Sequence, residues 1–244
     1  TTLNEGFGYA QGKYVLRMDA DDICRPERIQ KQVMFMELHP EVGISGCCAD
    51  VIGKEKEMIY DADDSNIRVK MLYQCHLLHP SIIIRKALID KYGWRYNPDY
   101  LHAEDYELFY RMSKVTHLAN LTERLILYRE HDNSVSRIYG QIQKENSLRV
   151  IKQQFGDIGL EISENEIELF KGLMYSRFDF SAKQITDLED LLFRVFEANE
   201  ESKKLNQKVL VEIVFQKWKD ILINTISTTE SYYKLALKSR LLKY

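Results

Sequence analysis

The feature that most constrains the fold is a change of pattern near residue 140. Before it, short apolar segments with β-propensity alternate with amphipathic segments of helical period, which is typical of an α/β layer fold. After it, proline disappears, glycine becomes rare and only segments of helical period follow, which indicates a small helical bundle. We therefore expect an α/β domain over residues 1–139 and a helical region over residues 140–244.

Several segments of the first part are predicted to be β-strands because they are short, apolar and bounded by turn residues. Among them, the mostly apolar run Tyr14–Met18 suits a buried strand. Helical periodicity fills the intervals. In the helix that follows Pro26, for example, we expect Ile29, Val33 and Met36 to face the core. The predicted strands are residues 14–18, 42–49, 81–85, 116–121 and 125–129.

Composition excludes several classes of protein. The formal net charge of -3 gives no electrostatic drive toward nucleic acid, so we expect no nucleic-acid partner. The sequence has neither an apolar run of the roughly 18–20 residues that a membrane span needs nor the pattern of a signal peptide. The cysteines, at positions 24, 47, 48 and 75, have no C-x-x-C spacing, so we expect reduced thiols in a cytoplasmic protein.

The predicted strand at residues 14–18 ends in an acidic tetrapeptide, Asp19-Ala20-Asp21-Asp22. In open α/β sheets, ligands bind beyond the carboxyl ends of the parallel strands. Carboxylates one residue apart, such as Asp19 and Asp21, can share a hard cation, Mg²⁺ or Mn²⁺, whose remaining ligands come from a diphosphate. The same tetrapeptide recurs at residues 61–64 after a polar segment, and there we expect a solvated loop with a helix N-cap.

Further short motifs accompany the acidic tetrapeptide in a fixed order, over roughly residues 3–137. This ordered series resembles the centre of bacterial family 2 glycosyltransferases. The resemblance implies the GT-A fold, a mixed sheet flanked by helices, and a role in making cell-envelope polysaccharides. The motifs are Asn4-x-Gly6, Gly12-Lys13-Tyr14-Val15-Leu16-Arg17-Met18-Asp19-Ala20-Asp21-Asp22, Pro26-Glu27-Arg28, Gln32, His79-Pro80-Ser81, Arg85, Asn97-Pro98-Asp99, Ala103-Glu104-Asp105-Tyr106-Glu107-Leu108, Leu127-Tyr128-Arg129-x-His131 and Asn133-Ser134-Val135-Ser136.

The resemblance also implies a metal-dependent enzyme that takes a sugar from a nucleotide-sugar donor with inversion at the anomeric carbon. The Asp-x-Asp of the family binds the donor ribose and the metal–diphosphate, which falls here on Asp19 and Asp21. We assign donor binding to Asp22, which is adjacent to this pair, and to Arg17 as well. A histidine after the last strand reaches the metal or the diphosphate in several family members, and His131 is the matching residue.

On the acceptor side, the resemblance assigns the catalytic base to Asp105. A carboxylate suits inverting transfer, because one base must take the proton of the acceptor hydroxyl as that hydroxyl attacks. Glu104, Trp94 and Tyr100 lie near this base in the sequence and are candidate acceptor contacts. For the two aromatic residues, packing in the core or at the rim of the site is the alternative.

The chain departs from the family pattern at its start, where the opening strand and further strand–helix units of the family are missing. We therefore expect a fragment or a truncated parent, and assign the activity to the intact parent. At the other end, residues 228–244 combine leucines and tyrosines with lysines and an arginine. This segment is predicted to be either a solvated helix or a basic amphipathic helix on the inner membrane face, next to a lipid-linked acceptor.

Two other functions stay open at the level of the sequence. One is a metal-dependent nucleotidyltransferase on a related α/β scaffold, which needs a phosphate-binding loop before the acidic strand. The other is a non-catalytic binding or scaffolding module that uses the helical region. Transfer of a sugar to a glycan or lipid-linked hydroxyl is the leading interpretation.

Overall fold

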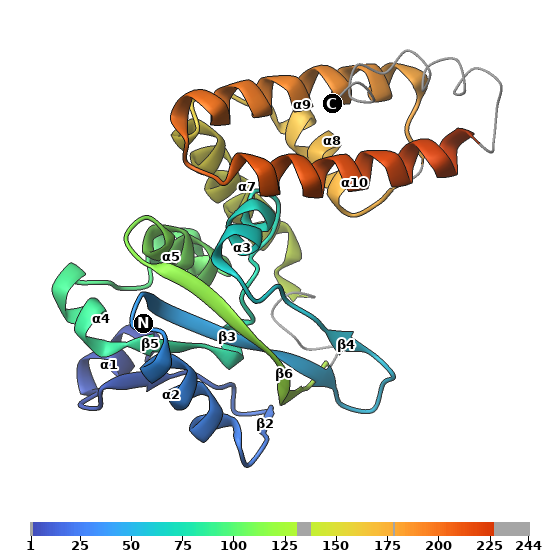
Figure 1. Cartoon of the computed structure of the whole chain (residues 1–244). Helices are drawn as coiled ribbons and strands as arrows, with labels where there is room; N and C mark the ends of the chain where they lie inside the picture. Colours follow the sequence, from blue (N-terminus) through green and yellow to red (C-terminus); the bar gives the residue numbers. More distant parts are fainter. Residues whose placement is uncertain (1, 131–137, 178, 227–244) are drawn as a thin grey trace. The chain divides into compact units, whose positions relative to one another are not determined.

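The computed structural model describes residues 2–130, 138–177 and 179–226 (Figure 1). The chain divides into two compact units, Thr1–Val150 and Ile151–Tyr244. This division lies inside helix α7 (Gly140–Asp157), whereas the sequence predicts a boundary just before that helix. Each unit is described here by itself.

Within the described residues, the first unit is built on a six-stranded mixed sheet with helices packed around it (Figure 1). The fold class expected from the sequence is therefore confirmed. β1 and β2 form the two edges of the main path, and β4 pairs with β3 beside that path. In order across the sheet the strands are β1 (Tyr14–Leu16), β5 (Ile83–Arg85), β3 (Val42–Val51), β6 (His117–Tyr128) and β2 (Ile23–Cys24), with β4 (Glu57–Met58) on β3.

Strand direction places the loop after β1 and the end of β6 at the same edge of the sheet. β3 and β6 are parallel, whereas β5 is antiparallel to both β1 and β3. Hence β1, β3 and β6 run in one direction and their carboxyl ends meet. The acidic tetrapeptide after β1 lies at this edge, where ligands of open α/β sheets bind.

The helices of the first unit follow the predicted order, with one error in orientation. In the helix after Pro26, the buried side chains are Arg28, Gln32 and Met36, whereas Ile29 is 59% exposed. The prediction for Ile29 is therefore wrong, because the buried hydrogen bonds of Arg28 and Gln32 decide which face of this helix packs against the core. The helices are α1 (Thr2–Tyr9), α2 (Arg28–Leu38), α3 (Asp64–Met71), α4 (Lys86–Tyr92) and α5 (Glu104–Ser113), with short 3₁₀ turns η1 (His79–Ser81) and η2 (Pro98–Tyr100).

The two strands predicted at residues 116–121 and 125–129 are one strand, β6. The polar residues between them suggested a turn. In the structure they sit at an irregularity of the parallel ladder, where Cys47 pairs with Leu121 and Cys48 pairs with Arg124. A bulge of this kind interrupts apolar alternation without ending the strand.

The four cysteines all lie in the first unit and are unpaired, as the sequence predicts. Cys47 and Cys48 are buried in the sheet. Burial raises the pKa of the Cys47 thiol to about 11, which keeps this thiol protonated and unreactive at neutral pH.

The second unit is helical, as expected, and its core includes the buried residues Phe155, Phe170 and Trp218. Two of its helices begin with capping boxes, at Ser163 and Ser181, which satisfy the first backbone N–H groups. None of the described helices combines the length and apolar character of a membrane span. The predicted segment 228–244 lies outside the described residues. Besides the end of α7, the helices are α8 (Glu164–Met174), α9 (Ala182–Ser202) and α10 (Gln207–Ile226).

Candidate active site

The acidic loop after β1 is held in place by the ends of two strands. Arg17 donates to both carboxylate oxygens of Asp19, at 2.7 and 2.5 Å. At the end of β6, the backbone N–H of Arg129 donates to Asp22 Oδ1 at 2.8 Å, and Arg129 Nε donates to the backbone carbonyl of Asp21 at 2.8 Å. The loop is thus fixed at the carboxyl edge of the sheet.

A buried polar network supports this loop from behind. Arg28 donates to the backbone carbonyl of Arg17 and to Gln32 Oε1, both at 2.8 Å. Gln32 in turn donates to the backbone carbonyl of Ser81 at 2.8 Å. Arg28 and Gln32 belong to the sequence motifs of the resemblance, but no role follows for them from the sequence. Their contacts show that they position the end of β1.

The carboxylates of the loop differ in environment. Asp22 is buried, and Asp21 is exposed. Burial, together with the charges of Asp19 and Asp21, raises the pKa of Asp22 above its usual range, and the bond from Arg129 opposes this rise. Asp22 Oδ2 is buried with no hydrogen-bond partner among the described residues. A buried oxygen in that state needs a partner from elsewhere.

These oxygens fit a hard cation that is shared with a substrate phosphate. Mg²⁺ commonly takes one or two carboxylates and completes its shell with phosphate and water oxygens. The described part of the chain holds no cluster of three His, Cys, Asp or Glu ligands for a metal. Arg17 already pairs with Asp19, so a cation that uses Asp19 competes with this ion pair. His131, the third predicted ligand, lies outside the described residues.

Asp105 stands in the first turn of α5. Its Oδ1 accepts the backbone N–H of Tyr106 at 2.8 Å. Burial raises the pKa of Asp105 to about 6, with a further rise from Glu104, while the bond from Tyr106 and the charge of Arg17 oppose it. The side chain is still 24% exposed, which leaves room for a substrate hydroxyl to reach it. A carboxyl with a pKa near 6 can accept a proton efficiently at neutral pH.

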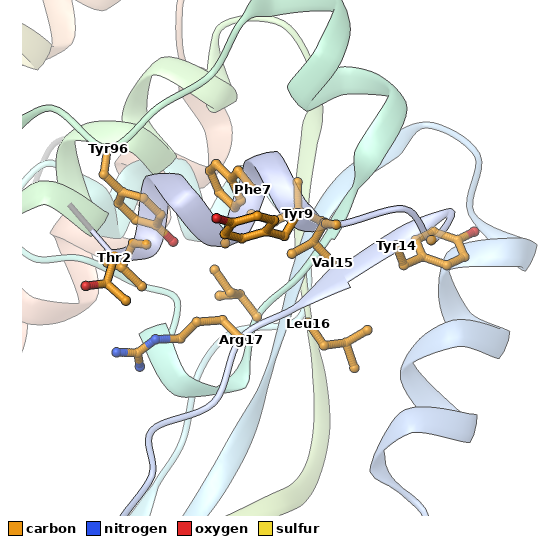
Figure 2. A pocket seen from close by; sticks show the side chains of 14 residues that line it. Thr2, Phe7, Tyr9, Tyr14, Val15, Leu16, Arg17 and Tyr96 are labelled. Atoms are coloured by element: carbon orange, nitrogen blue, oxygen red, sulfur yellow. The ribbon is translucent and has the colours of Figure 1, made fainter.

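Arg17 connects the acidic loop with Asp105. It pairs with Asp19, and its charge lowers the pKa of both Asp105 and His79. Together with Tyr96, it lines a cavity of about 510 Å³ between α1 and β1. Figure 2 shows the Arg17 side chain extending from the end of β1 toward the side of the cavity where Tyr96 lies. The charge of Arg17 therefore acts on both Asp19, a predicted donor ligand, and Asp105, the predicted base.

The three candidate acceptor contacts differ in placement. Glu104 has a buried oxygen, Oε2, without a hydrogen-bond partner among the described residues. Trp94 is buried and stacks on Tyr92 with ring centroids 5.2 Å apart, and Tyr100 is buried beneath the guanidinium of Arg149 at 4.1 Å. For these two rings the packing arrangement is observed, and an acceptor contact stays a prediction.

The loop before Asp105, residues 97–103, is fastened by the start of α7. His102 in this loop has a left-handed backbone conformation, with φ of 65°. Residues other than glycine rarely adopt this conformation unless the surrounding structure holds them in it. Three side chains on one face of α7 donate to its carbonyl oxygens and supply that constraint. The bonds run from Gln143 to His102 at 3.0 Å, from Asn146 to Leu101 at 2.9 Å and from Arg149 to Asp99 at 2.7 Å.

The second acidic tetrapeptide, residues 61–64, has a structural role. Asp63 caps α3 by accepting the backbone N–H of Asn66 at 3.0 Å, which confirms the predicted N-cap. The loop is less solvated than predicted. Asp61 pairs with His76 at 2.6 Å and with Lys70 at 2.5 Å, and these partners lower the pKa of its carboxyl to about 2.

The first unit thus combines a mixed sheet, an acidic loop at the carboxyl edge of that sheet and a partly buried carboxyl, Asp105, of raised pKa. The sequence profile described as "Glycosyl transferase family 2" matches residues 1–93. The match links residues 1–93 of the chain to this family of glycosyltransferases.

Relatives of known sequence support the same family. An uncharacterized glycosyltransferase of Haemophilus influenzae is 31% identical over 177 residues, which cover 66% of this chain and 55% of the relative. The amylovoran biosynthesis glycosyltransferase AmsE of Erwinia amylovora is 29% identical over 177 residues, 71% of this chain and 63% of the relative. The chain thus spans between half and two thirds of the length of these relatives.

A solved structure, that of S. aureus TarS in complex with UDP, has a TM-score of 0.48 to this chain at 18% sequence identity. The match covers 95% of this chain and 70% of TarS. The family assignment rests on the sequence matches.

Proposed function

We propose that the protein transfers a sugar, with inversion, from a nucleoside-diphosphate sugar to a hydroxyl of a glycan or a lipid-linked glycan. The observation that carries the proposal is the position of Arg17, which pairs with Asp19 of the acidic loop and acts electrostatically on Asp105. An enzyme of this kind needs its donor site and its base next to each other. The name of the relative AmsE, which refers to the biosynthesis of amylovoran, supports a glycan acceptor.

On the donor side, Asp21 and Asp19 would hold Mg²⁺ or Mn²⁺, and Arg17, which now pairs with Asp19, would be available to a phosphate oxygen of the donor. A bound divalent cation supplies Lewis-acid stabilisation of the charge on the departing diphosphate. Asp22 keeps the loop in shape through its bond to the N–H of Arg129. His131 is a further candidate ligand.

On the acceptor side, the Asp105 carboxylate takes the proton of the acceptor hydroxyl while the hydroxyl oxygen attacks the anomeric carbon. The new glycosidic bond forms as the bond between that carbon and the diphosphate oxygen breaks, and the nucleoside diphosphate leaves. No nucleophile of the protein takes part, so one displacement gives inversion. Glu104, whose buried oxygen lacks a partner in the described structure, orients a neighbouring acceptor hydroxyl.

The test is a pair of matched substitutions in the intact protein. Asp105→Asn removes the base and is expected to lower the transfer rate at least about 100-fold, because general-base catalysis contributes about 10²–10⁴. Donor affinity, measured by calorimetry with Mn²⁺ present, should stay within a few-fold of wild type. Asp99→Asn changes the same charge at an exposed position of the preceding loop and should leave the rate unchanged. Full turnover by Asp105→Asn refutes the assignment of the base.

The predicted contact of residues 228–244 with a membrane surface also remains a proposal. Liposome flotation of the protein with and without this segment tests it. Equal binding of the two forms to anionic vesicles removes the idea of a membrane-bound tail.

A further inference from the structure

His79 lies in a buried contact between Asp105 and Tyr96. Its Nε2 is 3.0 Å from the hydroxyl of Tyr96, and its Nδ1 is 3.9 Å from Asp105 Oδ2. The His79 side chain is 14% exposed. The histidine opens the 3₁₀ turn η1, so its backbone is fixed by the turn and by the strand β5 that follows.

The rings on either side of this contact are held by several elements. Asn4 of α1 makes two hydrogen bonds with the backbone of Tyr96, at 2.9 and 2.8 Å, and Phe7 stacks on the Tyr96 ring at 5.2 Å. Phe109 of α5 meets the His79 ring edge-on, with centroids 5.9 Å apart. These contacts restrict both rings and hold the His79 ring between Tyr96 and Asp105.

The protonation states of the two rings define the hydrogen bonds. Burial, with the charge of Arg17, lowers the pKa of His79 well below its usual value, so the imidazole is neutral at pH 7. Burial and the charge of Asp105 raise the pKa of Tyr96, so the phenol keeps its proton. A neutral imidazole that accepts the Tyr96 hydroxyl at Nε2 carries its own proton on Nδ1, the nitrogen that faces Asp105.

We propose that His79 is a positioning residue for Asp105. When the acceptor binds, His79 donates from Nδ1 to Oδ2 of the Asp105 carboxylate, and Tyr96 fixes the tautomer of His79 that this bond requires. The inference rests on the proposed function of Asp105 as the base. The backbone N–H of Tyr106 already holds Oδ1. With a donor at each oxygen, the carboxylate has one orientation, and the second lone pair of Oδ2 points to the acceptor. Catalytic hydrogen bonds are often long before substrate binds, which accounts for the 3.9 Å separation.

The same contact has a consequence for the pH dependence of the reaction. A hydrogen bond to the ionised form of a carboxyl lowers its pKa, and the loss of that bond raises it. Other titratable groups also interact electrostatically with Asp105, and each variant below changes at most one of them. They are Glu104 on its own helix, Arg17 at the end of β1, Tyr96 before η2, and Tyr60 and Cys75 on the segments around α3.

The experiment compares pH profiles of kcat, which report the pKa of the base in the substrate-bound enzyme, for sugar transfer by the intact wild-type protein and three variants. His79→Ala should move the acidic limb to higher pH by about half a unit or more, and should lower kcat more than it raises KM for the acceptor. His79→Asn should restore the wild-type limb, because its amide can donate near the position of Nδ1. Tyr96→Phe, which is nearly isosteric, removes the hydroxyl that keeps the proton of His79 on Nδ1. It should therefore move the acidic limb in the same direction as His79→Ala.

Acidic limbs that stay at the wild-type pH in both His79→Ala and Tyr96→Phe overturn the inference, even if turnover falls, because they leave His79 with a packing role. If His79→Ala does not fold, Tyr96→Phe decides the question alone. The proposed function fails separately, when Asp105→Asn keeps wild-type transfer. An inactive Asp105→Asn combined with unmoved limbs removes the role of His79 and leaves the base in place.

Discussion

Arg85 joins four segments of the first unit. Its replacement should therefore destabilise the first unit more than the loss of an exposed ion pair does. Its guanidinium donates to the carbonyl oxygens of Val42 at 2.7 Å and His39 at 2.9 Å, to the hydroxyl of Tyr14 at 3.0 Å, and to the carbonyl of Met36. These bonds cap the end of α2 and tie it to β1, β3 and β5.

The magnitude follows from the number of acceptors left behind. In Arg85→Met the methionine keeps part of the apolar stem, but the carbonyl oxygens at the end of α2 lose a charged donor. Hydrogen bonds to charged groups contribute about 1.5–3 kcal/mol each, and partial access of water offsets some of the loss. We expect unfolding of the first unit to become easier by about 3 kcal/mol. The matched control, Lys86→Met, removes a helical ion pair with Asp90 and should cost about 0.5 kcal/mol or less.

Urea unfolding followed by tryptophan fluorescence measures both effects. The sequence has two tryptophans, Trp94 in the first unit and Trp218 in the second, so a Trp218→Phe background makes Trp94 the reporter of the first unit. A cost of less than about 1 kcal/mol for Arg85→Met, indistinguishable from that of Lys86→Met, would refute the reasoning.

Three further predictions follow from other parts of the first unit. A Cβ at Gly46 would overlap with Asn120 Oδ1 and lie 3.0 Å from Ser81 Oγ, so Gly46→Ala should cost about 2 kcal/mol in urea unfolding. The control is Gly8→Ala in α1, where a Cβ would meet no described atom outside its own helix within 4 Å, so this change should be neutral or slightly stabilising. Arg149→Ala removes the hydrogen bond to the Asp99 carbonyl and should lower kcat/KM for the acceptor about tenfold at unchanged donor KM. Gln141→Ala, at an exposed position of the same helix, is the control, and equal effects of the two substitutions would contradict the fastening of the loop. Because Asp105 must be ionised to act and its pKa is about 6, kcat/KM should fall about tenfold per pH unit below pH 6, and an acidic limb near pH 4 would contradict the raised value.

Periodicity predicted most of the fold because it reports burial directly. The strand before Asp19 and the helix of Asp105 both lie where apolar spacing places them. It failed where polar residues are buried. Side-chain hydrogen bonds of Arg28 and Gln32 decide which face of α2 packs against the core. The spacing of apolar residues carries no information about such bonds. The break predicted before Leu125 failed for a related reason, because a bulge in a long strand looks like a turn in the sequence.

The candidate site was predicted in part. The Asp-x-Asp loop and Asp105 came from motifs, and the structure adds that Arg17 pairs with Asp19 and that its charge lowers the pKa of Asp105. The contact of His79 with Tyr96 and Asp105 joins residues 17 and 26 positions away from the histidine, and nothing local in the sequence signals it. The fastening of residues 97–103 by α7 is equally non-local. Long-range polar contacts of this kind need the fold before they can be found.

The most direct measurement is the binding of Mn²⁺, followed by electron paramagnetic resonance, in the presence and absence of a nucleoside diphosphate. The account predicts that the nucleotide creates a site for Mn²⁺ in the wild-type protein and that Asp21→Asn abolishes it. Asp63→Asn, the matching change in the second tetrapeptide, should leave binding intact because asparagine also caps a helix. Nucleotide-dependent Mn²⁺ binding that survives in Asp21→Asn would contradict the central claim.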